Sequence, residues 1–208
     1  METRRLTTLD QAKALVDCVY ETYGLTYHRD WLYDAERVLE QNARQDVLSF
    51  VATEGTRVVG HLALIRPAFE LTDDGAPLTS GDTRETGLAL VSPSVRRMGV
   101  QAELAMEATK WVFQSTLNYS FMKCVTHHLA SQKGTKRNGG IPTGLLLGSI
   151  PRWVRYDTES LQDNEPISTL LFMVPLRPSA GALVVPEGFS WLPALCERAD
   201  SPRAVLPH

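Results

Sequence analysis

The sequence predicts a single α/β domain with a mixed, mostly antiparallel central sheet flanked by helices, and three observations predict this fold class. Apolar residues recur at helical spacing over residues 8–23. Two runs rich in β-branched residues, 47–52 and 58–65, flank a Glu-Gly-Thr turn, which is typical of an antiparallel hairpin. A third apolar run, 83–91, leads through a tight turn into another helical stripe. The length of 208 residues fits one domain with additions better than two full domains.

Two helices are expected before the hairpin. The first spans Thr8 to Tyr23, and Gly24 follows where a C-terminal cap is expected. The second begins after Asp34, whose side chain is a suitable N-cap. An aromatic cluster fills the connection between these helices, and we expect its rings in the walls of the core or of a cleft. Its members are Tyr27, His28, Trp31 and Tyr33.

The elements after the hairpin follow from the same signals. Residues 67–82 carry Asp and Gly turns and few apolar anchors, which predicts a surface excursion. The strand over 83–91 stops at Ser92-Pro93, because proline lacks the N–H that a strand ladder needs. The other expected elements are a helix over 98–115, a strand over 121–126, a polar helix over 131–138, strands over 144–150 and 168–176, and a weak last helix over 192–198.

The composition is that of an ordinary globular protein. With 43% apolar and 22% charged residues, the chain is not disordered, collagen-like or a coiled coil. Its net charge of −3 gives no global reason to bind nucleic acid or an anionic membrane, so we expect neither as a partner. No apolar run approaches the roughly 18 residues that a membrane span needs.

The cysteines indicate a reducing compartment. Cys18, Cys124 and Cys196 are odd in number and widely spaced, with no Cys-x-x-Cys pattern and no histidine pair suited to zinc beside them. We therefore expect no metal. No apolar segment follows the basic start of the chain, so no secretory signal is expected and the protein is placed in the cytoplasm.

The junction of strand, turn and helix over residues 85–102 is the most informative segment. The first N–H groups of a helix lack intrahelical partners and carry the positive end of its dipole, which suits a phosphate. Gly99 leaves room for that approach, and Arg96 and Arg97 add charge. Simple turn chemistry is the alternative interpretation of the same residues.

The ordered pattern Val-x-Pro-x-x-Arg-x-x-Gly, from Val91 to Gly99, resembles the coenzyme A signature of the GNAT-type N-acetyltransferase superfamily. The order of helices and strands from Leu6 to Leu176 also resembles that family. The resemblance implies a GNAT-like acyl-CoA-binding domain over residues 1–176. Residues 177–208 would then be a C-terminal extension, for which an incomplete element is one interpretation.

The resemblance implies acetyl-CoA as cosubstrate. By position, Leu90 and Val91 would meet its pantetheine arm. The residues expected around its pyrophosphate are Arg96, Arg97, Met98, Gly99, Val100 and Gln101. Two of them depart from the family pattern. Gln101 stands where Gly or Ala is usual, and Met98 stands where a basic residue or Gly is common, but neither change removes the backbone N–H donors.

A narrower resemblance concerns residues 125–148, which carry Val-Thr-His-His, Ser-Gln, Gly, Thr-Gly and Leu-Gly in that order. It is similar to a subgroup of bacterial GNAT-like domains, some of which are joined to regulatory ATPase modules.

Acyl transfer to an amine needs a base for the amine proton, a donor for the developing oxyanion and an acid for the leaving thiolate. The resemblance implies that Glu85 takes the amine proton, directly or through water, and that a backbone N–H near Leu90 is the oxyanion donor. A solvated glutamate at a strand end is the alternative for Glu85. His127 and His128 end the next strand, where a histidine near neutrality can act as base or acid or can be purely structural. If that strand stays extended, only one of the two points into the cleft.

The acid that the family usually supplies as a tyrosine is replaced by Thr135, and Gly140 stands where an aromatic residue is usual. Three interpretations are then open: another group protonates the thiolate, the thiolate leaves without a proton, or the protein has lost catalysis. Cys124 is expected to be a small buried residue rather than a nucleophile. The basic residues Lys133, Lys136 and Arg137 are expected on a solvated helix face rather than on coenzyme phosphate.

We therefore expect an acyltransferase that moves an acetyl group, not an aminoacyl group, directly from acetyl-CoA to an amine of a small molecule or a protein lysine. The alternative is a non-catalytic acyl-CoA sensor or regulatory domain. The sequence leaves a homodimer open.

Overall fold

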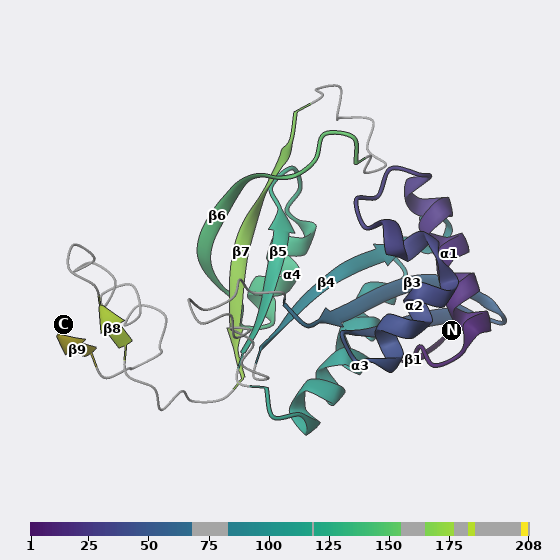
Figure 1. Cartoon of the computed structure of the whole chain (residues 1–208). Coiled ribbons are helices and arrows are strands. Elements are labelled where there is room, and N and C mark those ends of the chain that lie inside the picture. The colour runs from purple at the N-terminus through teal and green to yellow at the C-terminus, as the bar shows by residue number, and fades with distance from the viewer. Residues whose placement is uncertain (68–82, 118, 155–164, 177–182, 186–204, 208) are drawn as a thin grey trace.

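A seven-stranded mixed sheet forms the centre of the protein in a computed structural model, which describes residues 1–67, 83–117, 119–154, 165–176, 183–185 and 205–207. The strand order is β1-β2-β3-β4-β5-β7-β6. Every neighbouring pair is antiparallel except β4 and β5, which are parallel (Figure 1). The strands are β1 (Glu2–Arg5), β2 (Val47–Glu54), β3 (Arg57–Ile65), β4 (Thr83–Val91), β5 (Tyr119–Val125), β6 (Ile141–Ile150) and β7 (Ile167–Pro175).

Four α-helices and two short 3-10 helices accompany this sheet in the described part of the chain. They are α1 (Leu9–Tyr23), η1 (Asp30–Tyr33), α2 (Ala35–Ala43), η2 (Pro93–Val95), α3 (Val100–Gln114) and α4 (Ala130–Arg137). The expected fold class is confirmed. None of the described helices combines the length and apolar character that crossing a bilayer requires.

The ends of α1 follow the expected capping rules. The Thr8 side chain accepts a hydrogen bond from the backbone N–H of Gln11, and the Gln11 side chain accepts one from the N–H of Thr8. At the other end, the Gly24 N–H donates to the carbonyl of Tyr20, with Gly24 at φ +60°. Asp34 caps α2 in the expected way by accepting from the second and third N–H groups of that helix.

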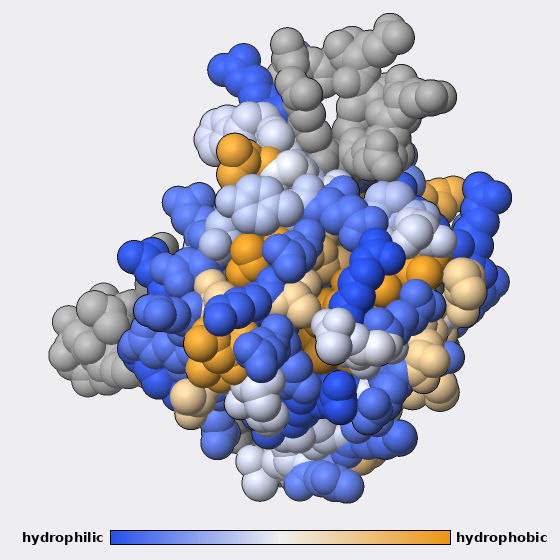
Figure 2. All heavy atoms as spheres, turned by 90° about the vertical axis from the view of Figure 1, so that its right-hand side faces the viewer, coloured by the Kyte–Doolittle hydropathy of each residue, from blue (hydrophilic) through white to orange (hydrophobic). Residues whose placement is uncertain are grey.

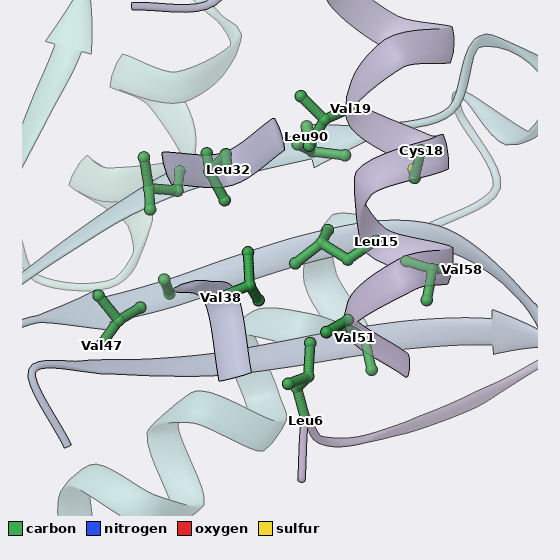
Figure 3. Packing of buried hydrophobic residues seen from close by; sticks show 13 residues of the cluster. Leu6, Leu15, Cys18, Val19, Leu32, Val38, Val47, Val51, Val58 and Leu90 are labelled. Carbon is green, nitrogen blue, oxygen red and sulfur yellow. The ribbon is translucent and has the colours of Figure 1, made fainter. Parts of the chain in front are cut away.

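Two apolar clusters cover the two faces of β2 and β3, because side chains alternate between the faces of a strand. In one cluster, α1, η1 and α2 pack on the sheet (Figure 3). Members include Leu6, Leu15, Val19, Leu32, Val38 and Val51. In the other, α3 packs on the opposite face, and members include Phe50, Leu62, Leu64, Leu104 and Val112. The side of the molecule that carries α1 is mostly hydrophilic on its surface (Figure 2).

Helix α3 approaches β3 most closely at Gly60. A Cβ added there would lie 2.7 Å from Val100 Cγ1 and 3.1 Å from Leu104 Cδ1. Only glycine therefore leaves room for the first turn of α3. This contact fixes the height of the helix start above the sheet.

The structure departs from the expected elements at several boundaries. The strand β1 was not predicted, because only four residues of mixed polarity form it. Helix α3 begins at Val100 rather than at residue 98, and β6 begins at Ile141 rather than at residue 144. The excursion expected over 67–82 lies outside the described residues from residue 68 on. The helix expected over 192–198 also lies outside them.

Two short strands lie beyond β7. Strands β8 (Leu183–Val185) and β9 (Val205–Pro207) pair in parallel as a separate two-stranded sheet. The division into a domain over 1–176 and an extension over 177–208 stays a prediction.

Candidate active site

The sheet opens between β4 and β5. These strands pair over only three residues each, Thr83–Glu85 with Tyr119–Phe121. Beyond that point β4 continues beside β3, and β5 continues beside β7. A cleft of about 970 Å³ occupies the opening, and its walls include the whole stretch from Glu85 to Val91. One edge of β4 thus lines a cavity instead of pairing with a neighbouring strand.

A β-bulge shapes β4 within this cleft. His61 pairs with Leu90 and Ala63 pairs with Gly87, so Leu88 and Ala89 together oppose the single residue between them on β3. Leu88 has φ +51°, a left-handed conformation that costs a non-glycine residue roughly 1–2 kcal/mol. Such strain persists only where surrounding contacts hold it.

The turn after β4 leads into an uncapped helix start. After η2, Arg97 has φ +68° and Gly99 has φ +83°, and α3 begins directly after Gly99. No side chain of the described residues caps this helix. A Cβ added to Gly99 would meet no atom within 4 Å, so the approach to the helix start is open. This geometry suits an anion that accepts from the first N–H groups of α3.

The residues expected around a coenzyme divide into two groups. Leu90, Val91, Arg96 and Gln101 line the cleft. Arg97, Met98 and Gly99 are exposed on the turn and are not part of the cleft wall, and the side chain of Val100 is buried under α3. Their backbone, rather than their side chains, is what this turn can offer a ligand.

A cluster of hydrogen-bonded polar side chains stabilises the turn that follows β4. The Arg57 guanidinium donates to both carboxylate oxygens of Glu21 at 2.6 Å. The Ser92 hydroxyl donates to the same carboxylate at 2.9 Å and lies 2.8 Å from the Ser94 hydroxyl. The bond from Arg57 lowers the pKa of Glu21, so the cluster stays ionised at neutral pH. It ties α1 and β3 to the residues that follow β4.

Glu85 lies in the cleft wall near the point where β4 and β5 separate. Its side chain is 13% exposed, and its Oε2 atom lies 3.1 Å from Nζ of Lys123 on β5. Lys123 also lies over the ring of Phe121, 5.7 Å from its centroid. The carboxylate is therefore held by a cation from the opposite wall.

His127 and His128 both line the cleft. The strand does not stay extended as far as these residues, because β5 ends at Val125 and the two histidines lie in the segment before α4, so the alternation expected of an extended strand does not apply to them. Their rings are 4.6 Å apart and nearly perpendicular. Burial, and then the charge of His128, lower the pKa of His127, so His127 is neutral at pH 7. The amide of Gln132 holds the bend by donating to the carbonyls of Val125 and His128.

Thr135 is 5% exposed and is held within a packed wall of the cleft. Its hydroxyl oxygen lies 3.2 Å from the sulfur of Cys124 and 3.2 Å from the sulfur of Met122. A Cβ on Gly140 would lie 2.5 Å from Thr135 Cγ2. The two departures from the family pattern, at Thr135 and Gly140, are therefore coupled by packing. Cys124 is 3% exposed and hydrogen-bonded to Thr135, as expected of a small buried residue.

His28 is the site residue for which the sequence predicted no chemical role. It lines the cleft together with Tyr23, Tyr27 and Arg29, all from the connection between α1 and η1 or the end of α1. The rings of Tyr23 and Tyr27 are 4.7 Å apart, and those of Tyr27 and His28 are 4.9 Å apart. Burial lowers the pKa of His28, and Glu85 raises it in part. The only signal in the sequence was the aromatic cluster, which indicated a wall and not a base.

The basic residues of α4 differ in position. Arg137 lines the cleft, whereas Lys133 and Lys136 are exposed and lie outside its wall. Among the residues that the structure describes, no group of three or more His, Cys, Asp or Glu side chains could hold a metal ion.

The sheet opens between two parallel strands, and an uncapped helix start lies beside the opening after a glycine turn. This arrangement suits an extended ligand that carries phosphate. The chain belongs to the acetyltransferase (GNAT) family, whose profile matches residues 13–139. The expected family is confirmed, and the enzyme class is that of an acetyltransferase.

Solved structures share the fold at low sequence identity. A ribosomal-protein-alanine N-acetyltransferase from Brucella melitensis is 18% identical, covers 85% of this chain and 100% of its own, and has a TM-score of 0.61. The PaiA N-acetyltransferase from Thermoplasma acidophilum, in complex with coenzyme A, is 14% identical, with 84% and 98% covered and a TM-score of 0.55. An aminoglycoside 6'-N-acetyltransferase complexed with coenzyme A is 11% identical, with 86% and 99% covered and a TM-score of 0.59. A comparison with curated protein sequences finds no match.

Proposed function

We propose that the protein transfers an acetyl group from acetyl-CoA directly to an amine in the cleft between β4 and β5. The observation that carries the proposal is the juxtaposition of the open edge of β4 with the uncapped start of α3. A thioester on a phosphate-bearing carrier needs both features, one for its phosphates and one for its extended arm. Two of the similar structures are coenzyme A complexes, which supports this assignment.

The coenzyme would lie along the turn and the far half of β4. The N–H groups of the turn and of the first residues of α3 would hold the pyrophosphate, with the Arg96 guanidinium adding charge. Leu90 and Val91 would meet the pantetheine arm. The side chain of Gln101 is exposed at the cleft wall, so it has room to move aside or to donate to a phosphate.

The amine would enter beside Glu85 and the histidines. Glu85 would take the proton of an ammonium group, directly or through water, and leave the neutral amine to attack the thioester carbonyl. The developing oxyanion would accept from a backbone N–H of β4 near Leu90. Direct transfer is favoured over an acyl-cysteine route, because Cys124 is buried and its thiol is hydrogen-bonded to Thr135.

The leaving thiolate needs a proton, and the Thr135 hydroxyl is a poor source because it is packed between two sulfur atoms. His127 and His128 border the same cleft. After the attack the amine nitrogen still carries a proton that it must lose, and a neutral histidine that accepts this second proton can return it to the thiolate. Glu85 would release the first proton to solvent, so that the enzyme is unchanged after one cycle. We assign to this pair both the base that takes the second amine proton and the acid that protonates the thiolate.

The identity of the acceptor is not fixed by the fold, since similar structures include enzymes named for a ribosomal-protein alanine and for an aminoglycoside. The proposal covers a small-molecule amine or a protein lysine. A non-catalytic acyl-CoA sensor is the second candidate, favoured by Thr135 at the position of the usual tyrosine acid.

Cys18 and Cys124 are free and buried, which supports a reducing, cytoplasmic compartment.

Calorimetry with acetyl-CoA tests the shared part of both candidates. We expect saturable binding that the Gly99→Glu substitution weakens by about tenfold or more, because a carboxylate then faces the phosphates. Gly55→Glu is the matched control, since Gly55 also has a positive φ but lies in the β2–β3 hairpin. Absence of binding at millimolar ligand would exclude both candidates.

Release of free coenzyme A across a panel of amines then separates enzyme from sensor. We expect at least one amine to give release that the Glu85→Gln, His127→Ala, His128→Ala triple variant lacks. If no amine raises release above that of the triple variant, the catalytic role loses its support and the sensor is favoured.

A further inference from the structure

His61 is a fully buried histidine in the middle of β3, with an exposed fraction of 0%. Its Nδ1 atom lies 2.8 Å from the carbonyl oxygen of Leu88 on β4. Gly60 faces α3, so strand alternation directs the neighbouring His61 side chain to the face covered by α1. A histidine is chemically unusual at the centre of an apolar core.

The acceptor of this hydrogen bond determines which ring nitrogen of His61 carries the proton. A carbonyl oxygen only accepts, so Nδ1 carries the proton and Nε2 does not. Burial lowers the pKa of His61 to about 4, so the ring stays neutral at physiological pH. Nε2 is buried and has no hydrogen-bond partner among the described residues. A leucine would fill similar space without burying a lone ring nitrogen, so packing alone does not explain a histidine here.

The bond ends at the one residue of β4 whose backbone is left-handed. Leu88 is the first of the two bulged residues, at φ +51°. The Leu88 carbonyl belongs to the peptide unit that continues into the N–H of Ala89. A donor that holds this carbonyl therefore also holds the orientation of the next N–H, because a peptide unit is planar. Both residues line the cleft.

We propose that His61 is a positioning residue for acyl transfer, which holds the bulge of β4 so that its backbone N–H groups are aimed at the oxygen of the acetyl thioester. This role rests on the proposed function. His61 does not touch the substrate itself. It acts through Leu88 as a neutral donor with a fixed tautomer.

Two substitutions separate donation from packing. In His61→Asn the side-chain amide nitrogen takes the place of Nδ1 and can still donate to Leu88. In His61→Leu the volume is largely kept and the donor is lost. Unfolding by denaturant reports whether each variant is folded before any ligand is added. The readout is the infrared stretch of acetyl-CoA labelled with carbon-13 at the thioester carbonyl, since a hydrogen bond to that oxygen lowers its frequency.

We expect the carbonyl band of bound acetyl-CoA to lie below its position in solution for the natural protein and for His61→Asn. For His61→Leu we expect at least half of that shift to be lost, while the Kd of coenzyme A without an acetyl group changes by less than about threefold. Once an amine substrate is found, kcat should fall in His61→Leu with little change in the KM for acetyl-CoA.

An unshifted band in the natural protein, or equal shifts in all three proteins, overturns the positioning role. So does a leucine variant that loses coenzyme A binding and the band shift together, because that result indicates general disorder of the cleft. If the natural protein binds neither coenzyme A nor acetyl-CoA, the proposed function itself fails. That outcome is distinct from every outcome that overturns the role of His61 alone.

Discussion

Nζ of Lys123 lies 3.1 Å from Oε2 of Glu85, and this ion pair joins β5 to β4 just where the two strands separate. Glu85 is paired with Phe121 in the sheet, and Lys123 is the next residue on the same face of β5. The side chain of Glu85 is 13% exposed and that of Lys123 is 37% exposed, so the carboxylate is the more enclosed partner. The cation holds it at the wall of the cleft, where the proposed function requires a proton acceptor for the amine.

Replacing Glu85 by Gln is expected to lower kcat by roughly a hundredfold or more, because the proton acceptor for the amine is lost. The Kd of acetyl-CoA should change little, since the turn that would hold the coenzyme is untouched. Steady-state rates with an amine substrate and calorimetry measure the two quantities.

Glu107→Gln is the matched control for that substitution. Glu107 forms an ion pair with Lys110 at 2.9 Å on α3 and is not part of the cleft wall. We expect its kcat to equal that of the natural protein. A Glu85→Gln variant as active as Glu107→Gln would remove Glu85 from the mechanism.

The left-handed turn at Gly99 leads to a second prediction. Gly99→Ala should lower the free energy of unfolding by roughly 1–2 kcal/mol, because a Cβ is disfavoured at φ +83°. It should also weaken acetyl-CoA binding, since relief of the strain tilts the first N–H groups of α3. Denaturant unfolding and calorimetry report the two effects.

Gly55→Ala distinguishes these two consequences. Gly55 has φ +61° and, like Gly99, open space around a new Cβ, but it lies in the β2–β3 hairpin. We expect a similar loss of stability with unchanged acetyl-CoA binding. Equal binding losses in both variants would indicate that the effect at Gly99 is global rather than local.

The pair of histidines gives a pH-dependent prediction. As a base, His127 works in its neutral form, so the rate rises with pH as the ring loses its proton. Its pKa is lowered by burial and by His128, so the midpoint of the rise should lie below the ordinary histidine value of about pH 6.5. In His128→Ala the second cause is removed, the pKa of His127 moves up, and the rising limb should shift to higher pH.

Titration of the ring protons by NMR measures the pKa of His127 directly, and a pH profile of kcat/KM tests its role. His28→Ala is the necessary comparison, because burial also lowers the pKa of His28 in the same cleft. A rising limb that survives in His127→Ala and vanishes in His28→Ala would transfer the base role to His28.

The sequence predicted those parts of the site that depend on local signals. Helical periodicity placed α1, and the pattern from Val91 to Gly99 placed the turn that opens α3. The proline after β4 and the glycine before α3 act on their own backbone, so they can be interpreted without knowledge of the fold. Glu85, His127 and His128 all line one cleft, and the catalytic roles that the resemblance implies for them stay predictions.

Features that depend on contacts between distant segments were beyond the sequence. The left-handed conformation of Leu88 has no local signal, because leucine rarely adopts it and only tertiary contacts such as the bond from His61 hold it there. His28 reaches the cleft through the path of the chain after α1. The orientation of the histidine pair depended on where the strand ends, which a sequence defines only to within a few residues, and an end at Val125 removes the alternation.

The close approach of α3 to β3 gives the last prediction. In Gly60→Ala the new Cβ would lie 2.7 Å from Val100 Cγ1, so α3 must move away from the sheet. We expect a loss of roughly 1–3 kcal/mol in the free energy of unfolding, as in other overpacked cores. Because α3 begins at Val100, the displacement should also move the N–H groups proposed to hold the pyrophosphate, and acetyl-CoA binding should weaken.

The double variant Gly60→Ala, Val100→Ala tests the steric cause, since it removes the methyl group that the new Cβ meets. The overlap with Leu104 Cδ1 at 3.1 Å remains, so recovery should be partial. The two substitutions should therefore be strongly non-additive in denaturant unfolding, with the double variant more stable than the sum of the single losses predicts. Simple additivity would show that the cost at Gly60 arises from the backbone of β3 and not from its contact with α3.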